Sequence, residues 1–193
     1  MMAAPALAQP APRQGHDPDF PCVQVLVPKL SPGQIWAGPP VDEIPAGAWN
    51  QDPDVAALVA QAADRRVPTD KLVAAMDAFA GQQGPDRDQR LTLLFAGVFD
   101  TMQGERDKAM DAIRRYSKLQ RELLDRIAGN LGKLSALPEA DPARAEVQES
   151  LTWDRRVLDD RRRMLATLCE RPAMIERRLG AVARTLYGHL TPG

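Results

Sequence analysis

The sequence predicts an all-α fold: a bundle of about six helices centred on a long antiparallel helical hairpin, with a proline-rich extended strap at the N-terminus. Eleven of the 17 prolines fall in residues 1–53. Beyond them, apolar residues recur at the spacings of three and four that mark amphipathic helices, and a Pro-Glu-Ala-Asp-Pro turn at 138–142 joins the two longest of these segments. The chain therefore divides into a remnant of an export signal (1–8), an extended strap packed on the core (9–53) and a helical bundle domain (54–190).

The composition fits one globular domain and argues against several classes of protein. Of the 193 residues, 44% are hydrophobic, which is enough for a sizeable core. The net charge of −1 argues against a general nucleic-acid binder, which carries a basic excess. It also removes the usual electrostatic attraction to an anionic membrane surface. No stretch of the sequence approaches the roughly 18 apolar residues that a membrane-spanning helix needs.

The first residues resemble the end of an export signal. Ala6-Leu7-Ala8 before Gln9 forms the A-x-A pattern of a signal-peptidase site, although the basic segment and most of the apolar segment of a signal are missing. We interpret this as the tail of an export signal in a bacterial protein, which predicts a periplasmic or secreted location. The alternative is an alanine- and proline-rich flexible end.

The strap at residues 9–53 is predicted to lack regular helix, because each proline removes a backbone donor and biases its neighbours toward extended conformations. The segment is nevertheless too apolar to stay solvated. We expect it to lie over the helical core with two tryptophans, Trp36 and Trp49, as its anchors. The other apolar residues of the strap are Phe20, Val23, Val25, Leu26, Val27, Ile35 and Ile44.

Three short helices are predicted after the strap. Asp52-Pro53-Asp54 is a strong start, with a capping carboxylate followed by proline in the first turn. The first helix ends at Pro68 and the second ends near Gly81. A third begins after Gly84-Pro85-Asp86. Gly104 is a candidate break in it, and the alternative is that the helix continues through Gly104 at a cost of about 1 kcal/mol.

The central hairpin is predicted from helices at about 105–136 and 143–170, and Pro172 allows a bend into a last helix. A tight turn near residue 139 makes facing residues sum to about 278, which pairs Ile127 with Leu151. The second hairpin helix carries two apolar stripes about 100° apart. We therefore expect it to be internal to the bundle, and an isolated two-helix rod is disfavoured. The first stripe is Val147, Leu151, Leu158, Leu165 and Cys169. The second stripe should pack on the earlier helices, and its members are Trp153, Val157, Met164 and Leu168.

The candidate site residues are few. The two cysteines, Cys22 and Cys169, are predicted to form a disulfide in an exported chain, and the alternative is two separate thiols. Four polar residues should meet in the hairpin and form either a binding pocket or a polar layer that sets the register. These residues are Tyr116, Gln120, Asp154 and Arg161.

No catalytic motif, phosphate-binding loop or paired metal motif is present in the sequence, so no cofactor or metal is expected. The first hypothesis is an exported, non-catalytic helical interaction protein, an accessory subunit or chaperone-like binder, whose partner is another exported or envelope protein. The alternative is a small-ligand or metal-binding protein with a pocket between strap and bundle, lined by Trp36, Trp49, Tyr116 and Arg161.

Overall fold

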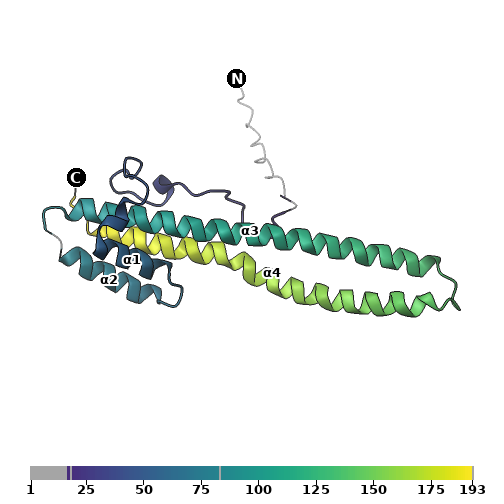
Figure 1. Ribbon diagram of the computed structural model, residues 1–193. Coiled ribbons are helices and arrows are strands. Elements are labelled where there is room, and N and C mark those ends of the chain that lie inside the picture. Colours follow the sequence, from purple (N-terminus) through teal and green to yellow (C-terminus); the bar gives the residue numbers. More distant parts are fainter. Residues whose placement is uncertain (1–16, 18, 83, 193) are drawn as a thin grey trace, which may run out of the picture.

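The computed structural model describes residues 17, 19–82 and 84–192, and the regular structure of this part is entirely helical (Figure 1). The predicted export remnant, residues 1–8, lies outside the described residues. No strand occurs within the described ranges, which agrees with the predicted all-α class. The elements are two 3₁₀ turns, η1 (Pro32–Gln34) and η2 (Ala48–Gln51), and the helices α1 (Pro53–Ala63), α2 (Thr69–Gly81), α3 (Arg87–Ala136) and α4 (Ala143–Gly188).

The prediction of about six helices is wrong, because neither the candidate break at Gly104 nor the expected helix boundary before Pro172 occurs, and the described residues form four α-helices. α3 continues through Gly104, and α4 continues through Pro172. A glycine inside a helix costs only about 1 kcal/mol and a proline about 3 kcal/mol. The two helices pack along each other, and this packing outweighs both local penalties. Pro172 still removes one helical hydrogen bond, and α4 bends in this region (Figure 1).

The start of α1 is fixed by one aspartate, as the sequence predicts. The Asp52 carboxylate accepts hydrogen bonds from the backbone N–H groups of Asp54 and Val55. The same carboxylate accepts two hydrogen bonds from the Arg90 guanidinium of α3, both at 2.8 Å. These bonds to Arg90 lower the pKa of Asp52. One side chain therefore caps α1 and ties it to α3.

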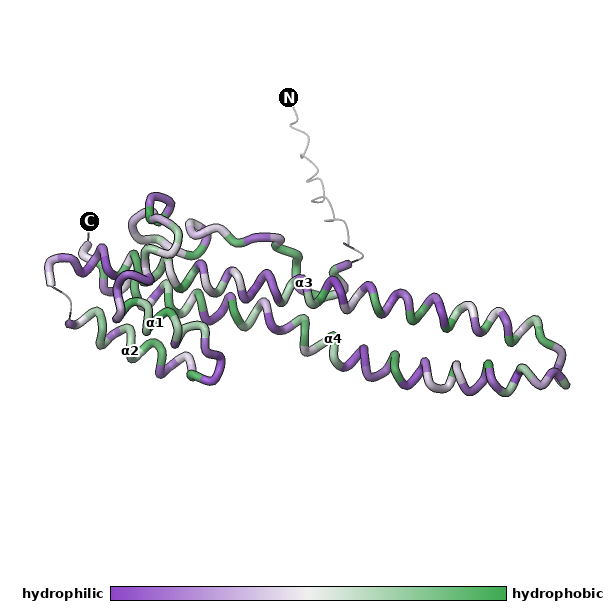
Figure 2. Tube along the Cα trace, viewed as in Figure 1, coloured by the Kyte–Doolittle hydropathy of each residue, from purple (hydrophilic) through white to green (hydrophobic). Residues whose placement is uncertain are grey.

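The main hydrophobic core lies at one end of the molecule, where α1 and α2 pack against the start of α3 and the end of α4 (Figure 2). Trp36 of the strap enters this core and stacks on Phe95, with ring centroids 4.3 Å apart. Its indole N–H donates to the Pro39 carbonyl at 2.8 Å. Trp49 packs beside it against Gly97. We call this end of the molecule the head.

The strap continues from the head along α3 and ends in a second, smaller core. Phe20 and Cys22 are buried there against Met110 and Ile113 of α3. The apolar residues between the two cores behave differently from the prediction, since Val23 is 98% exposed and Val25 is also exposed. The strap packs into a core at each end, and the side chains in its middle contribute little burial.

Beyond the head, α3 and α4 run side by side as a two-helix arm, which comprises residues 114–136 and 143–168 (Figure 1). Asn130 donates to Ser150 at 3.1 Å, and Arg126 donates to Asp154. The numbers of facing residues in the arm therefore sum to 280, whereas the sequence predicts a sum of about 278.

The expectation that the hairpin lies inside a bundle is wrong for the arm. Trp153 is 65% exposed and Met164 is 52% exposed, so no helix of the described residues covers the second stripe there. The reason is length. α1 and α2 have 11 and 13 residues, which span about 17 and 20 Å, whereas α3 and α4 rise about 75 and 69 Å. The two short helices cover only the head.

Candidate functional site

The structure does not bring the predicted pocket residues together. Trp36 and Trp49 lie in the head, whereas Tyr116 and Arg161 lie on the arm. From Gly97, which Trp49 contacts, α3 rises about 28 Å before it reaches Tyr116. A single pocket between strap and bundle lined by these four residues is therefore excluded.

The polar residues of the arm form a structural pair and do not form one cluster. Asp154 is 2% exposed and accepts two hydrogen bonds from Arg126, at 2.9 and 2.6 Å. The hydrogen bond from Arg126 lowers the pKa of Asp154. Arg161 donates instead to the backbone carbonyl of Leu119, and the buried Gln120 Oε1 has no hydrogen-bond partner among the described residues. These contacts join α3 to α4.

The two cysteines meet as the sequence predicts. The sulfur atoms of Cys22 and Cys169 lie at disulfide distance, 1.97 Å, and their Cα atoms are 5.5 Å apart. The pair joins the beginning of the described strap to α4 at the root of the arm. Phe20 of the strap and Met110 and Ile113 of α3 pack around it.

A second connection of the strap, through Arg106, was not foreseen from the sequence. Arg106 of α3 is 2% exposed. It donates to the carbonyl of Val27 at 2.6 Å and to the Glu176 carboxylate of α4 at 2.7 Å. A signal was present, because Arg106 lies on the same helix face as Met102 and Ala109, at spacings of four and three. An arginine inside an apolar stripe indicates a buried hydrogen-bonding role.

Arg178 of α4 closes the C-terminal end of α1. It donates to the carbonyl of Ala62 at 2.8 Å, to Val67 at 2.7 Å and to Gln61 at 3.0 Å. The last carbonyls of a helix lack helical partners, and a cation there also complements the helix dipole. Desolvation lowers the pKa of Arg178. The α1–α2 connection is thereby held against α4.

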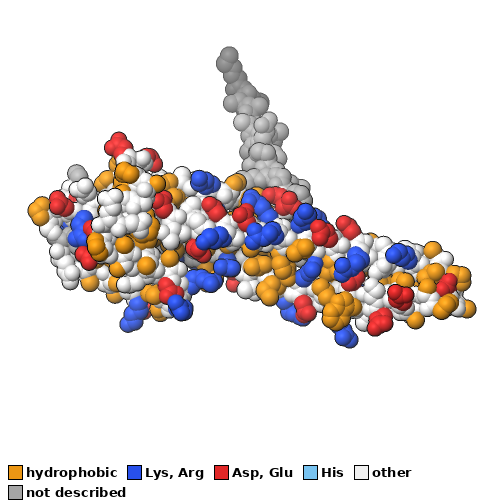
Figure 3. Space-filling model, in the orientation of Figure 1, with side chains coloured by type: hydrophobic (Ala, Val, Ile, Leu, Met, Phe, Trp, Pro, Cys, Tyr) orange, Lys and Arg blue, Asp and Glu red, His pale blue; other side chains and the backbone are white. Residues whose placement is uncertain are grey.

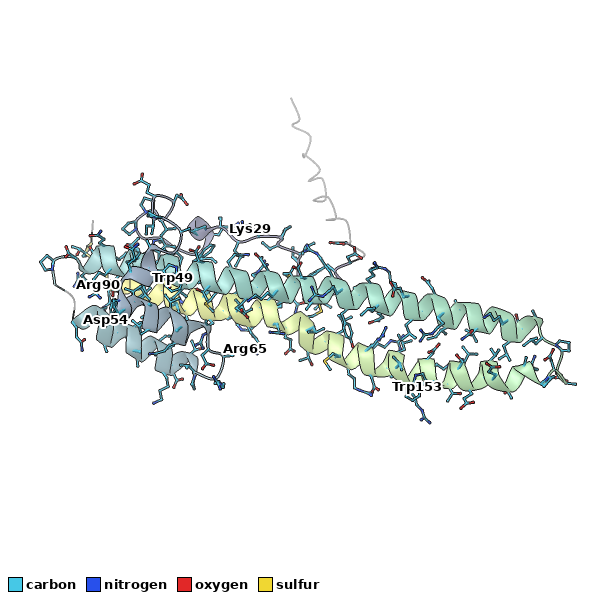
Figure 4. All side chains as sticks on the ribbon, viewed as in Figure 1. Lys29, Trp49, Asp54, Arg65, Arg90 and Trp153 are labelled. Carbon is cyan, nitrogen blue, oxygen red and sulfur yellow. A yellow bond between two sulfur atoms is a disulfide. The ribbon has the colours of Figure 1, made fainter. Side chains whose placement is uncertain are left out.

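A cavity of about 220 Å³ lies beside this connection, where the head meets the arm. We call it the shoulder pocket. Its wall is mainly apolar, with Arg65 and Arg171 at its edge, and Figure 4 shows Arg65 at the end of the head that faces the arm. Lys108, then Arg171 and Arg65, lower the pKa of Glu105, which also lies at the edge. The lining is Ala62, Ala63, Arg65, Val67, Pro68, Thr69, Met102, Glu105, Arg171, Met174, Ile175 and Arg178, and no strap residue contributes.

One apolar stripe of α4 connects the shoulder pocket to the arm. At 100° per residue, its eight members fall within about 80° of the helix circumference. In the head, the stripe is buried or partly buried against the main core. On the arm it is exposed at Trp153 and Met164 and partly buried at Val157 and Leu168, and Leu168 packs against the second core. The members that pack in the head are Ile175, Leu179, Val182 and Leu186. The members that lie beyond α1 and α2, which we call the open stripe, are Trp153, Val157, Met164 and Leu168.

The open stripe contains the two most exposed large apolar side chains of the arm, Trp153 and Met164. Hydrophobic side chains gather along this part of the surface in Figure 3, and Trp153 projects from α4 away from α3 in Figure 4. Of its four members, Trp153 and Met164 are exposed, and Val157 and Leu168 are partly buried. The candidate functional site is therefore the open stripe together with the shoulder pocket at its inner end.

Searches for related proteins add no functional information. No family model matches the chain, and neither the curated proteins nor the solved structures include a significant match. Among the described residues, no group of three or more His, Cys, Asp or Glu side chains is arranged to hold a metal ion. None of the helices in the described part of the chain is both long and apolar enough to cross a membrane.

Proposed function

We propose that this protein is an exported, non-catalytic interaction protein, an accessory subunit or chaperone-like binder, which holds another protein against the open stripe. One observation carries the proposal: a single apolar stripe of α4 is covered in the head, whereas on the arm it exposes Trp153 and Met164. The cysteine pair at disulfide distance and the A-x-A pattern at residues 6–8 support an exported location.

The energetics favour a partner on this surface. Full burial of a side chain such as Met164 stabilises a protein by about 1.5–3 kcal/mol, and Trp153 is larger. Both lie on a preformed helix, so no backbone entropy is lost there when a partner covers them, and the cost is the rotamer freedom of the two side chains. An amphipathic helix laid against α4 would extend the layer that α1 and α2 begin, which is the helix-in-groove mode of recognition.

Site-specific photo-crosslinking in the cells that make the protein tests the proposal. The photoreactive amino acid p-benzoylphenylalanine replaces Trp153 in one variant and Val23 in a control variant. Val23 is also apolar and is 98% exposed, but it lies on the strap. We expect a discrete adduct from position 153 and none from position 23. No adduct from position 153, or equal adducts from both positions, would refute the proposal.

A small-ligand function is the second candidate, and the shoulder pocket is the observation that favours it. Its volume of about 220 Å³ exceeds the roughly 150 Å³ that holds a benzene molecule. It is smaller than the roughly 300–1,000 Å³ of most ligand sites. A thermal-shift screen with small metabolites, compared between the wild type and an Ile175→Trp variant that fills the pocket, would detect such a ligand.

A further inference from the structure

We propose that the partner on the open stripe is a second copy of this chain, packed arm against arm in antiparallel order. The inference rests on the proposed function, in which the open stripe is an interaction surface. Three features of α4 support it: the length of the open part, the order of its apolar residues and the charges at its two ends.

The first feature is length. The part of α4 that α1 and α2 leave uncovered extends from Ala143 at the tip of the arm to Arg171 at the shoulder pocket. This is a rise of about 42 Å. A second arm laid antiparallel has the same length, so the tip of each arm reaches the shoulder of the other copy. The head then blocks any further overlap, and the two arms stop in one register.

The second feature is the pattern along α4. Glu146, Trp153, Met164 and Arg171 are separated by 7, 11 and 7 residues. At 100° per residue they lie within about 20° of one another around the helix. The four positions are symmetric along the helix about a point between residues 158 and 159, so that 146 mirrors 171 and 153 mirrors 164. A two-fold axis there places Trp153 against Met164 of the second copy, and a two-fold interface uses the same surface on both subunits.

The third feature is charge. In the same register, Glu146 at the tip faces Arg171 at the shoulder of the second copy, and this pairing occurs twice. Glu149 lies near Glu146 at the tip of the arm. Arg65 lies near Arg171 at the shoulder pocket. Among the described residues, none of these four side chains forms a hydrogen bond or an ion pair within 4 Å; Arg65 and Arg171 act only through space on Glu105, whose pKa they lower. A parallel arrangement would place like charges together, so complementarity selects the antiparallel one.

The oligomeric state of the purified full chain tests the inference. The molecule is elongated, so its mass is measured by sedimentation equilibrium. We expect twice the chain mass for the wild type. Trp153→Glu should raise the dissociation constant about 30-fold or more, as expected for a central anchor. Val23→Glu, the control on the strap, should leave it unchanged. A wild type that stays monomeric at high micromolar concentration, or a dimer that Trp153→Glu does not weaken, would overturn the inference.

A charge exchange tests the register. Glu146→Arg alone places two arginines together at both ends, and Arg171→Glu alone places two glutamates together, so each variant should be mainly monomeric. An equimolar mixture should regain the dimer, because both contacts then join opposite charges. A mixture that stays monomeric would contradict the antiparallel pairing. Circular dichroism of each variant checks that these exposed or half-exposed substitutions leave the fold intact.

The crosslinking experiment separates this inference from the proposed function. An adduct from position 153 with twice the chain mass supports both. An adduct of any other mass overturns the self-association and leaves the interaction function standing. The absence of an adduct contradicts the interaction function itself.

Discussion

Two glycines of α3 provide a matched test of how the strap and α1 pack on that helix. A methyl group at Gly97 would lie 2.7 Å from Cγ of Trp49 and 2.8 Å from Cγ2 of Val59. Real contacts of this kind are not that short, so η2 or α1 must move. At Gly104 nothing lies within 4 Å of the added methyl group. Alanine is therefore expected to have opposite effects at the two positions of one helix.

The magnitudes follow from two opposing contributions. Alanine is more favourable than glycine in a helix interior by about 1 kcal/mol, and Gly104→Ala should be more stable by that amount. Gly97→Ala has the same gain in helix propensity, but its methyl group overpacks a site that a tryptophan ring and a buried valine already fill. Overpacking costs about 1–3 kcal/mol, and the two short contacts place this site at the upper end. The net loss should be about 2 kcal/mol.

Thermal unfolding followed by circular dichroism measures both effects. For a chain of this size, 1 kcal/mol shifts Tm by about 2–4 °C. Gly104→Ala should raise Tm by that amount, and Gly97→Ala should lower it by about 4–8 °C. Two shifts in the same direction, or a stabilised Gly97→Ala variant, would refute the packing of Trp49 against α3.

Three further outcomes are expected. Replacing Cys22 and Cys169 by serine should lower the free energy of unfolding by up to about 5 kcal/mol, because the pair closes a loop over 147 residues; equal urea midpoints with and without reductant would contradict it. Arg106→Met should cost about 2 kcal/mol through the lost charged hydrogen bonds and should expose the strap to limited proteolysis; a strap cut no faster than in the wild type would argue against this clamp. Arg126 lowers the pKa of Asp154, so the carboxylate stabilises the fold above the unfolded pKa, and this contribution is lost as the pH falls through the folded pKa. Asp154→Asn should therefore lower the free energy of unfolding by about 1–2 kcal/mol at neutral pH. It should also weaken the loss of stability below about pH 4. Urea unfolding with the same pH dependence as the wild type would contradict the role of the pair.

Features that depend on neighbours in the sequence were predictable. The start of α1 at Asp52-Pro53 follows from local capping chemistry, and the structure has the expected hydrogen bonds. The pairing of Cys22 with Cys169 needed only the even count of cysteines and an exported chain. The apolar stripe of Trp153 and Met164 was visible from its spacing alone.

Features that depend on what lies alongside each residue were not predictable. The two tryptophans of the strap were assigned to one pocket with Tyr116, although about 28 Å of helix separates Tyr116 from the site of Trp49. Arg178 has a mainly structural role because α1 happens to end beside it. Arg106 could have been suspected from its place in an apolar face, but its acceptors on the strap come from 79 positions away.

The sequence by itself determined the helical class, the cysteine pair and the existence of two apolar stripes on α4, because each depends on local propensity or on periodicity along one helix. Only the tertiary structure decided the number of helices and showed that the second stripe continues into the head, where its further members are covered. Packing of α3 and α4 against each other keeps α3 helical through Gly104 and α4 helical through Pro172. This packing energy cannot be read from the residues around either position. The open stripe exists because α1 and α2 are short and the hairpin is long, a difference that becomes visible only when the helices lie side by side.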